Sequence, residues 1–289
     1  MACRLRDRPP GGGADKTPGF ARSGWGTALR MTIATDTARI ARVCLVAALA
    51  AGCASESDRR ADAITETLTQ AAVASEANGD YVGAANQYTT LMQRRPDNFE
   101  VTLGLARNLR YTGRGKEAAR VLDDAQARFS DRVPFVLERG KAKLAAGDAR
   151  TAIDLLTRAR DLDGRDWEVH AALGIAFDLV ESYDKAKAAY ETARTLSKDK
   201  PVVLNNMAIS AALSGKLDEA IRLLEGAPVA ARHSPQIRQN LALFYGIKGD
   251  MEKAEGLAKM DLDEAAVRNN MAVFSKFHAV QGRSPQPKQ

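Results

Sequence analysis

Cysteine and histidine are scarce in this sequence, with three of each in 289 residues. His170, His233 and His278 lie more than 40 residues apart, with no other histidine or cysteine at metal-ligand spacing. Neighbouring acids such as Asp123 and Asp124 diverge on a helix, so they cannot share a proton. The sequence therefore predicts no metal site, no cofactor, no small-molecule substrate and no catalytic constellation.

An excess of positive charge is also missing from most of the chain. The formal net charge is +6, but residues 1–52 hold eight basic and three acidic residues, which leaves 34 basic and 33 acidic residues from position 53 onward. A nearly neutral chain gives nucleic acid little electrostatic attraction. We therefore expect no nucleic-acid partner.

The first 52 residues divide at Met31. Residues 1–30 are rich in Pro, Gly and Arg and have no apolar period, so we expect an untranslated or disordered extension. Residues 31–52 contain two arginines, nine apolar residues from Val43 to Ala51 and then small residues, which is the layout of a secretory signal peptide. Translation is expected to begin at Met31. The alternative is a genuine N-terminal extension followed by an internal signal anchor.

Cys53 lies in the stretch "LAAGCAS" (49–55) and is the only cysteine that the processed chain would keep. "AAGC" resembles the lipobox of bacterial lipoproteins, although Ala50 stands where leucine is most common. That resemblance implies lipidation of Cys53 and attachment to a membrane, since several acyl chains anchor a protein more firmly than one. The alternative is an ordinary cleaved signal peptide. Residues 53–64 would then be a tether.

A 34-residue period governs the rest of the chain. Glycine recurs every 34 residues from Gly79 to Gly249, interrupted only by Glu181, and an alanine follows each of the six positions by five residues. This period, with small residues around a turn, resembles the tetratricopeptide repeat, a helix-turn-helix unit. It implies an all-α, right-handed superhelical solenoid of six repeats over residues 65–268. A capping helix is expected over 269–281 and a disordered tail over 282–289.

Stacked repeats form a concave face lined by their first helices. In the register of the resembled family, a basic and aromatic stretch on this face passes into an apolar one, which would suit a protein or peptide with an acidic end and a hydrophobic end. The candidate groove residues are Arg107, Arg110, Tyr111, Lys141, Ile175, Asp178, Asn205, Ile209, Leu213, Gln239, Leu243 and Ile247.

The sixth repeat carries a narrower resemblance. The stretches "RQNLALFYGIKGDMEKAEGLAKMDL" (238–262) and "VRNNMAVF" (267–274), together with the lipobox and the repeats, resemble the TadD family of tight-adherence (Flp) pilus lipoproteins. The resemblance implies a noncatalytic, outer-membrane lipoprotein that faces the periplasm and helps to assemble the pilus, acting on the secretin. A general envelope scaffold that serves cell-wall enzymes or outer-membrane protein assembly is the alternative. An enzyme of unrecognised type is the third hypothesis.

Overall fold

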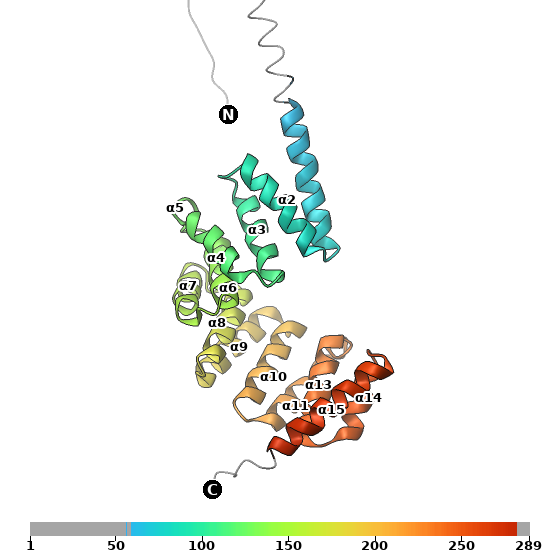
Figure 1. Cartoon of the computed structure of the whole chain (residues 1–289). Coiled ribbons are helices and arrows are strands. Elements are labelled where there is room, and N and C mark those ends of the chain that lie inside the picture. The colour runs from blue at the N-terminus through green and yellow to red at the C-terminus, as the bar shows by residue number, and fades with distance from the viewer. Residues whose placement is uncertain (1–55, 57–58, 282–289) are drawn as a thin grey trace, which may run out of the picture. The chain divides into compact units, whose positions relative to one another are not determined.

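The structure, a computed structural model, describes residues 56 and 59–281 of the chain (Figure 1). The expected extension 1–30, the signal peptide 31–52, Cys53 and the tail 282–289 lie outside the described residues. The chain divides into two units, 1–62 and 63–289, and the second contains the repeats. The residues described in the first unit, 56 and 59–62, are helical.

The second unit is built from helix pairs, and residues 63–281 contain no strand. Residues 63–77 are helical and pack against α2, where Ala72 shares a core with Ala84 and Tyr88. The labelled helices are α2 (Tyr81–Arg94), α3 (Phe99–Tyr111), α4 (Gly115–Asp124), α5 (Gln126–Phe129), α6 (Val133–Ala145), α7 (Ala149–Leu162), α8 (Trp167–Leu179), α9 (Tyr183–Ser197), α10 (Pro201–Leu213), α11 (Leu217–Glu225), α12 (Val229–Arg232), α13 (Pro235–Lys248), α14 (Met251–Ala258) and α15 (Glu264–Gln281). The expected all-α solenoid of six helix pairs and a C-terminal helix is confirmed.

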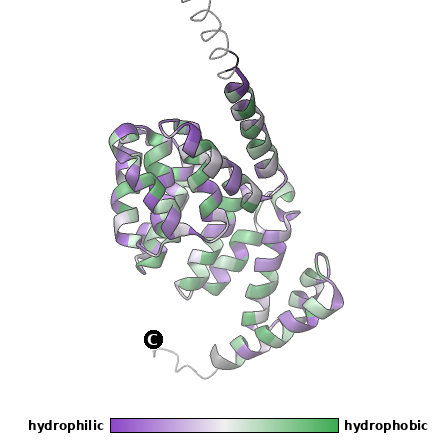
Figure 2. Ribbon diagram, turned by 45° about the horizontal axis from the view of Figure 1, so that its top comes forward, coloured by the Kyte–Doolittle hydropathy of each residue, from purple (hydrophilic) through white to green (hydrophobic). Residues whose placement is uncertain are grey.

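Small residues form the centre of each helix pair. The alanines that follow the turns, from Ala84 to Ala254, are all fully buried. Gly140 and Gly174 stand where a first helix crosses a second one, and a Cβ atom added at Gly140 would lie 2.6 Å from Leu156. Figure 2 shows hydrophobic and hydrophilic residues alternating along these helices, as expected for helices that bury one face.

The turn between the helices of each pair requires a left-handed residue. The five turn glycines have φ between 75° and 99°, and Glu181 has φ 57° at the same place in the fourth repeat. Glycine meets no steric penalty in this region, whereas a residue with a Cβ does. Glu181 therefore holds, with a side chain, the left-handed position that glycine takes in the other five turns.

Replacing Glu181 by glycine should therefore raise the free energy of unfolding by about 1 kcal/mol, the size of the penalty for a left-handed residue with a Cβ. Urea denaturation of the two proteins measures the difference. Ser182→Gly is the matched control, because Ser182 has φ −87° and gains nothing from glycine. An unchanged or lowered midpoint in Glu181→Gly would contradict the account of this turn.

Two repeats depart from the simple helix pair. The second helix of the second repeat is interrupted at Ala125, between α4 and α5. In the fifth repeat α11 ends at Glu225, and Pro228 directly precedes the short helix α12. A proline cannot continue the hydrogen bonding of the preceding turn, which explains the second interruption.

The C-terminal helix begins earlier than the expected 269–281. Asp263 accepts a hydrogen bond from the backbone N–H of Ala266 at 2.8 Å, which caps the helix and allows α15 to begin at Glu264. Phe274 is 5% exposed and lies against Gly246, whereas Phe277 is 52% exposed. The helix therefore covers the last repeat with only part of its expected apolar face.

Candidate partner-binding groove

Two adjoining pockets lie along the first helices of the second to fifth repeats. We call them the apolar pocket, of about 510 Å³, and the charged pocket, of about 380 Å³. They share Arg110, Tyr111, Lys141 and Glu168, so they form one groove. The apolar pocket is also lined by Leu144, Ala145, Trp167, Ala171, Ala172, Ile175, Leu179, Val202 and Asn206; the charged pocket is also lined by Leu103, Arg107, Pro134, Leu137, Glu138 and Asp166.

Five of the candidate groove residues line these pockets. They come from three first helices: Arg107, Arg110 and Tyr111 from α3, Lys141 from α6 and Ile175 from α8. Tyr111 is 51% exposed, and its ring lies 4.7 Å from that of Tyr81. The fold therefore brings these five predicted residues together along one groove.

The other candidates do not line either pocket. Asn205 is buried and accepts a hydrogen bond from Asn240, while Asp178 is half-buried and bonded to Tyr190 and Ser210. The remaining five lie further along the chain: Ile209 and Leu243 pack against the C-terminal core, Leu213 is exposed, Gln239 donates to Asp261, and the carbonyl of Ile247 contacts His278.

The basic stretch of the groove is neutralised by neighbouring repeats. Arg107 lies 3.8 Å from Glu76, and the Nε of Arg110 donates to Glu138 at 2.9 Å. Lys141 pairs with Glu168 of the next repeat. Each of the three cations that line the charged pocket thus has a carboxylate partner, so the acidic ligand end predicted from the sequence would find no unpaired positive charge there.

The ionisation of these groups reflects the pairing. Burial alone would raise the pKa of Glu168, but the hydrogen bond and charge of Lys141 outweigh it and lower the pKa. For Arg110, burial opposes the charged form, yet Glu138 raises its pKa. These ion pairs therefore remain charged at neutral pH.

Other residues of the apolar pocket were missed by the sequence reasoning, among them Trp167, Glu168, Leu179, Val202 and Asn206. Leu179 is 57% exposed and Val202 is 41% exposed. Glu168 and Val202 are the second residues of their 34-residue units, and Leu179 is the thirteenth of its unit, as Tyr111 is. Including the second and the thirteenth position of every unit in the predicted groove would have identified Glu168, Leu179 and Val202 from the sequence.

Beneath the groove, an acid and a tyrosine form the same network twice. The Tyr88 hydroxyl donates to Glu76 at 3.0 Å, and the Asn108 amide donates to Glu76 at 2.7 Å. Burial, followed by the negative charge of Glu76, raises the pKa of Tyr88 to about 12. The network ties the first repeat to the second.

The second copy of this network lies three repeats later. The Tyr190 hydroxyl donates to Asp178 at 2.9 Å, and Ser210 donates to the same carboxylate at 2.6 Å. Burial raises the pKa of Asp178 even though both hydrogen bonds favour its charged form, and burial raises the pKa of Tyr190 as well. In both networks the polar side chains of the first helices are hydrogen-bonded within the protein, so they are not available to a ligand.

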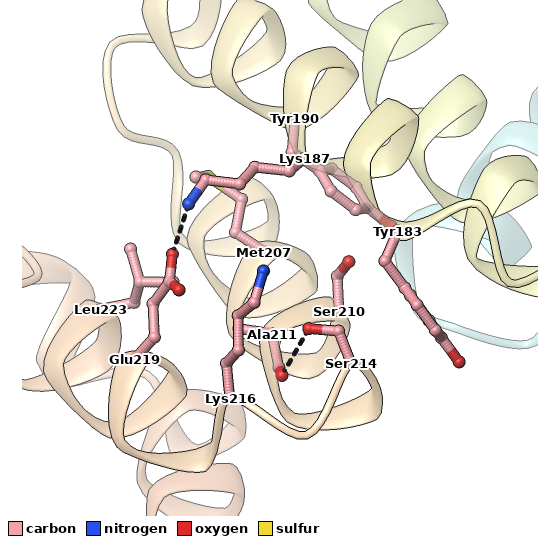
Figure 3. A pocket seen from close by; sticks show the side chains of 10 residues that line it. All are labelled: Tyr183, Lys187, Tyr190, Met207, Ser210, Ala211, Ser214, Lys216, Glu219 and Leu223. Atoms are coloured by element: carbon pink, nitrogen blue, oxygen red, sulfur yellow. Dashed lines mark hydrogen bonds and ion pairs between the residues drawn. The ribbon is translucent and has the colours of Figure 1, made fainter. Parts of the chain in front are cut away.

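A third pocket, between α9, α10 and α11, is small. Figure 3 shows its lining, in which Lys187 pairs with Glu219 at 2.7 Å and the Ser214 hydroxyl donates to the carbonyl of Ala211. Its volume of about 20 Å³ holds roughly one water molecule. It is too small for a substrate.

Neither a metal centre nor a membrane span is found in the described part of the chain. Residues 56 and 59–281 contain no group of three or more His, Cys, Asp or Glu side chains placed to hold a metal ion. None of the helices described is long and apolar enough to cross a bilayer.

Comparison with known proteins agrees with this architecture. A tetratricopeptide-repeat family model matches residues 76–134. No curated protein gives a significant match. The resemblance to the TadD family therefore gains no support from these comparisons.

Solved tetratricopeptide-type structures share the fold. TTC0263, a thermophilic TPR protein from Thermus thermophilus, is 22% identical with a TM-score of 0.57, over 62% of this chain and 98% of that one. Cut9–Hcn1 of the APC/C is 17% identical with a TM-score of 0.55, over 72% and 42%. The human IFIT1 dimer with m7Gppp-AAAA is 15% identical with a TM-score of 0.56, over 70% and 51%. At these identities the likeness defines the fold alone.

Proposed function

We propose that this protein is a noncatalytic tetratricopeptide-repeat lipoprotein that binds a partner protein through the groove on α3, α6, α8 and α10. The observation that carries the proposal is the groove itself, where exposed apolar side chains such as Tyr111 and Leu179 lie beside charges that are already paired. Apolar surface exposed in a concave face is typical of a protein-binding site.

The partner that we propose belongs to the Flp (tight-adherence) pilus machinery, with the secretin as the specific candidate. This step rests on the TadD resemblance of residues 238–262 and 267–274 and of the lipobox around Cys53. The protein would act as an assembly factor for pilus biogenesis and secretion.

Deletion of the gene in its host, followed by counting Flp pili by electron microscopy, tests the pilus assignment. We expect loss of pili and their return when the full chain is supplied. Normal pili in the deletion strain would contradict the assignment. Normal pili together with a defective cell wall or misassembled outer-membrane proteins would favour the general envelope scaffold instead.

The anchor is proposed to be lipidated Cys53, which would hold the protein in the outer membrane facing the periplasm. The intact mass of the membrane-extracted protein should correspond to a chain that begins at Cys53 and carries two or three acyl chains. Cys53→Ser should abolish the added mass and release the protein from the membrane fraction. An unmodified wild-type chain would contradict the anchor while leaving the groove proposal intact.

A further inference from the structure

The polar side chains of the first helices are already committed to one another. Arg107, Arg110 and Lys141 each pair with a carboxylate of a neighbouring repeat. Of the other polar side chains that line the groove, the Asp166 carboxylate accepts a hydrogen bond from the backbone N–H of Glu168 at 2.8 Å, and the Asn206 amide lies on α10. The groove therefore has few polar groups left for a ligand.

The small number of available polar groups in the groove distinguishes between an extended and a helical peptide ligand. An extended segment brings backbone N–H and C=O groups that must find partners, and burying such a group without one is unfavourable. A helix satisfies its backbone groups internally. A groove with few available donors and acceptors therefore favours a helical ligand.

The exposed apolar side chains of the groove come from successive repeats. Tyr111 is 51% exposed on α3, Ala145 is exposed on α6, Leu179 is 57% exposed on α8 and Val202 is 41% exposed on α10. Ile175, 38% exposed, adds to the surface on α8. Packed helices lie about 8–10 Å apart, and residues seven apart on a helix lie about 10.5 Å apart at 1.5 Å per residue. An apolar ridge with heptad-like spacing matches this arrangement.

The charge of the groove points to the same ligand. The charged pocket holds three cations and three carboxylates, and the hydrogen bond and charge of Lys141 keep Glu168 ionised. The three cations already have carboxylate partners, so an acidic ligand group buried there would lose its water without gaining a counter-ion, whereas an apolar face loses nothing.

We propose that the groove binds an amphipathic helix of the partner protein, seated with its uncharged apolar face on Tyr111, Ile175, Leu179 and Val202. This inference rests on the proposed function, in which the groove binds a protein. It adds the conformation and chemistry of the bound segment, and it replaces the acidic ligand end that the sequence had indicated.

A peptide selection tests the proposal without knowledge of the partner. A display library of random 16-residue peptides is selected on the full-length protein, and binders are retested on Leu179→Asp and on Leu162→Asp. Leu162 is a matched control because it is 45% exposed on the second helix α7, away from the groove. Circular dichroism and thermal melting confirm that both variants are folded.

We expect the selected peptides to carry apolar residues at i, i+3, i+4 and i+7 and to become helical when bound. Their affinity should fall at least about tenfold in Leu179→Asp, since a tenfold change needs only about 1.4 kcal/mol. Affinity should change less than about twofold in Leu162→Asp. Raising NaCl from about 50 to 500 mM should change affinity less than about threefold, because apolar contacts, which salt does not screen, carry the binding.

Groove-dependent peptides that are acidic, proline-rich or extended would overturn the helical ligand, yet leave protein binding by the groove in place. Self-association of the protein that disappears in Leu179→Asp would also overturn it, in favour of a second copy of the chain. Failure to select any peptide that depends on Leu179 would count against both this inference and the groove assignment in the proposed function. Loss of pili in the deletion strain is a separate outcome, so the failures remain distinguishable.

Discussion

Replacing Gly174 by alanine should lower the free energy of unfolding by about 2–3 kcal/mol, because it overpacks the crossing of α8 and α9. An added Cβ atom would lie 2.6 Å from the Cδ1 and Cζ atoms of Tyr190. The ring is 1% exposed, and its hydroxyl is bonded to Asp178, so it has little room to move. The helix propensity of alanine, about 1 kcal/mol better than that of glycine, cannot compensate for the clash.

Gly256→Ala provides the matched control. Gly256 lies within α14, and a Cβ atom added there meets nothing within 4 Å. The same substitution should stabilise the protein by up to about 1 kcal/mol. Urea denaturation of both variants gives the comparison, and equal effects of the two substitutions would contradict the packing of the fourth repeat.

Replacing Asp178 by alanine should destabilise the protein by about 2–4 kcal/mol, since each buried donor left without an acceptor costs about 1–3 kcal/mol. Tyr190 and Ser210 are 1% and 4% exposed, and both donate to the lost carboxylate. The burial that raises the pKa of Asp178 offsets part of this loss, because the charged carboxylate is itself held in an unfavourable place.

The control for Asp178→Ala is Asp154→Ala on the exposed face of α7, where a surface change of about 0.5 kcal/mol or less is expected. Chemical denaturation at pH 7 measures both variants. An effect of Asp178→Ala as small as that of Asp154→Ala would mean that the network between the fourth and fifth repeats carries little energy. The groove would then have more polar groups available to a ligand than the structure indicates.

The repeats could be predicted from the sequence because their signals are local. The positive φ of Glu181 follows from its place in the glycine column, and burial of the alanine column follows from its fixed distance to each turn. The early start of α15 was missed because a single cap, Asp263, decides it.

The groove could be predicted only in part. The repeat register placed Arg107, Tyr111 and Ile175 on the concave face. The pairing of its cations with Glu76, Glu138 and Glu168 depends instead on contacts between residues of neighbouring repeats that are 27 to 31 positions apart in the sequence. Net charge gives no information on such pairing. The sequence therefore predicted a basic surface, whereas the structure shows that its cations are paired with carboxylates.

The residues that carry the TadD resemblance also have structural roles. Arg238 pairs with Asp261, Gln239 donates to the same carboxylate, and Asn240 donates to Asn205. These contacts join α13 to the segment after α14 and to the fifth repeat. These three residues therefore hold the last repeat together, and ligand recognition must be tested at the groove.

The central claim is that this groove holds the partner needed for pilus assembly. Its most direct test is the number of Flp pili on deletion cells that produce either Leu179→Asp or Leu162→Asp at the level of the wild-type chain. We predict that Leu179→Asp leaves the cells without pili and that Leu162→Asp restores them. Full restoration by Leu179→Asp would contradict the claim.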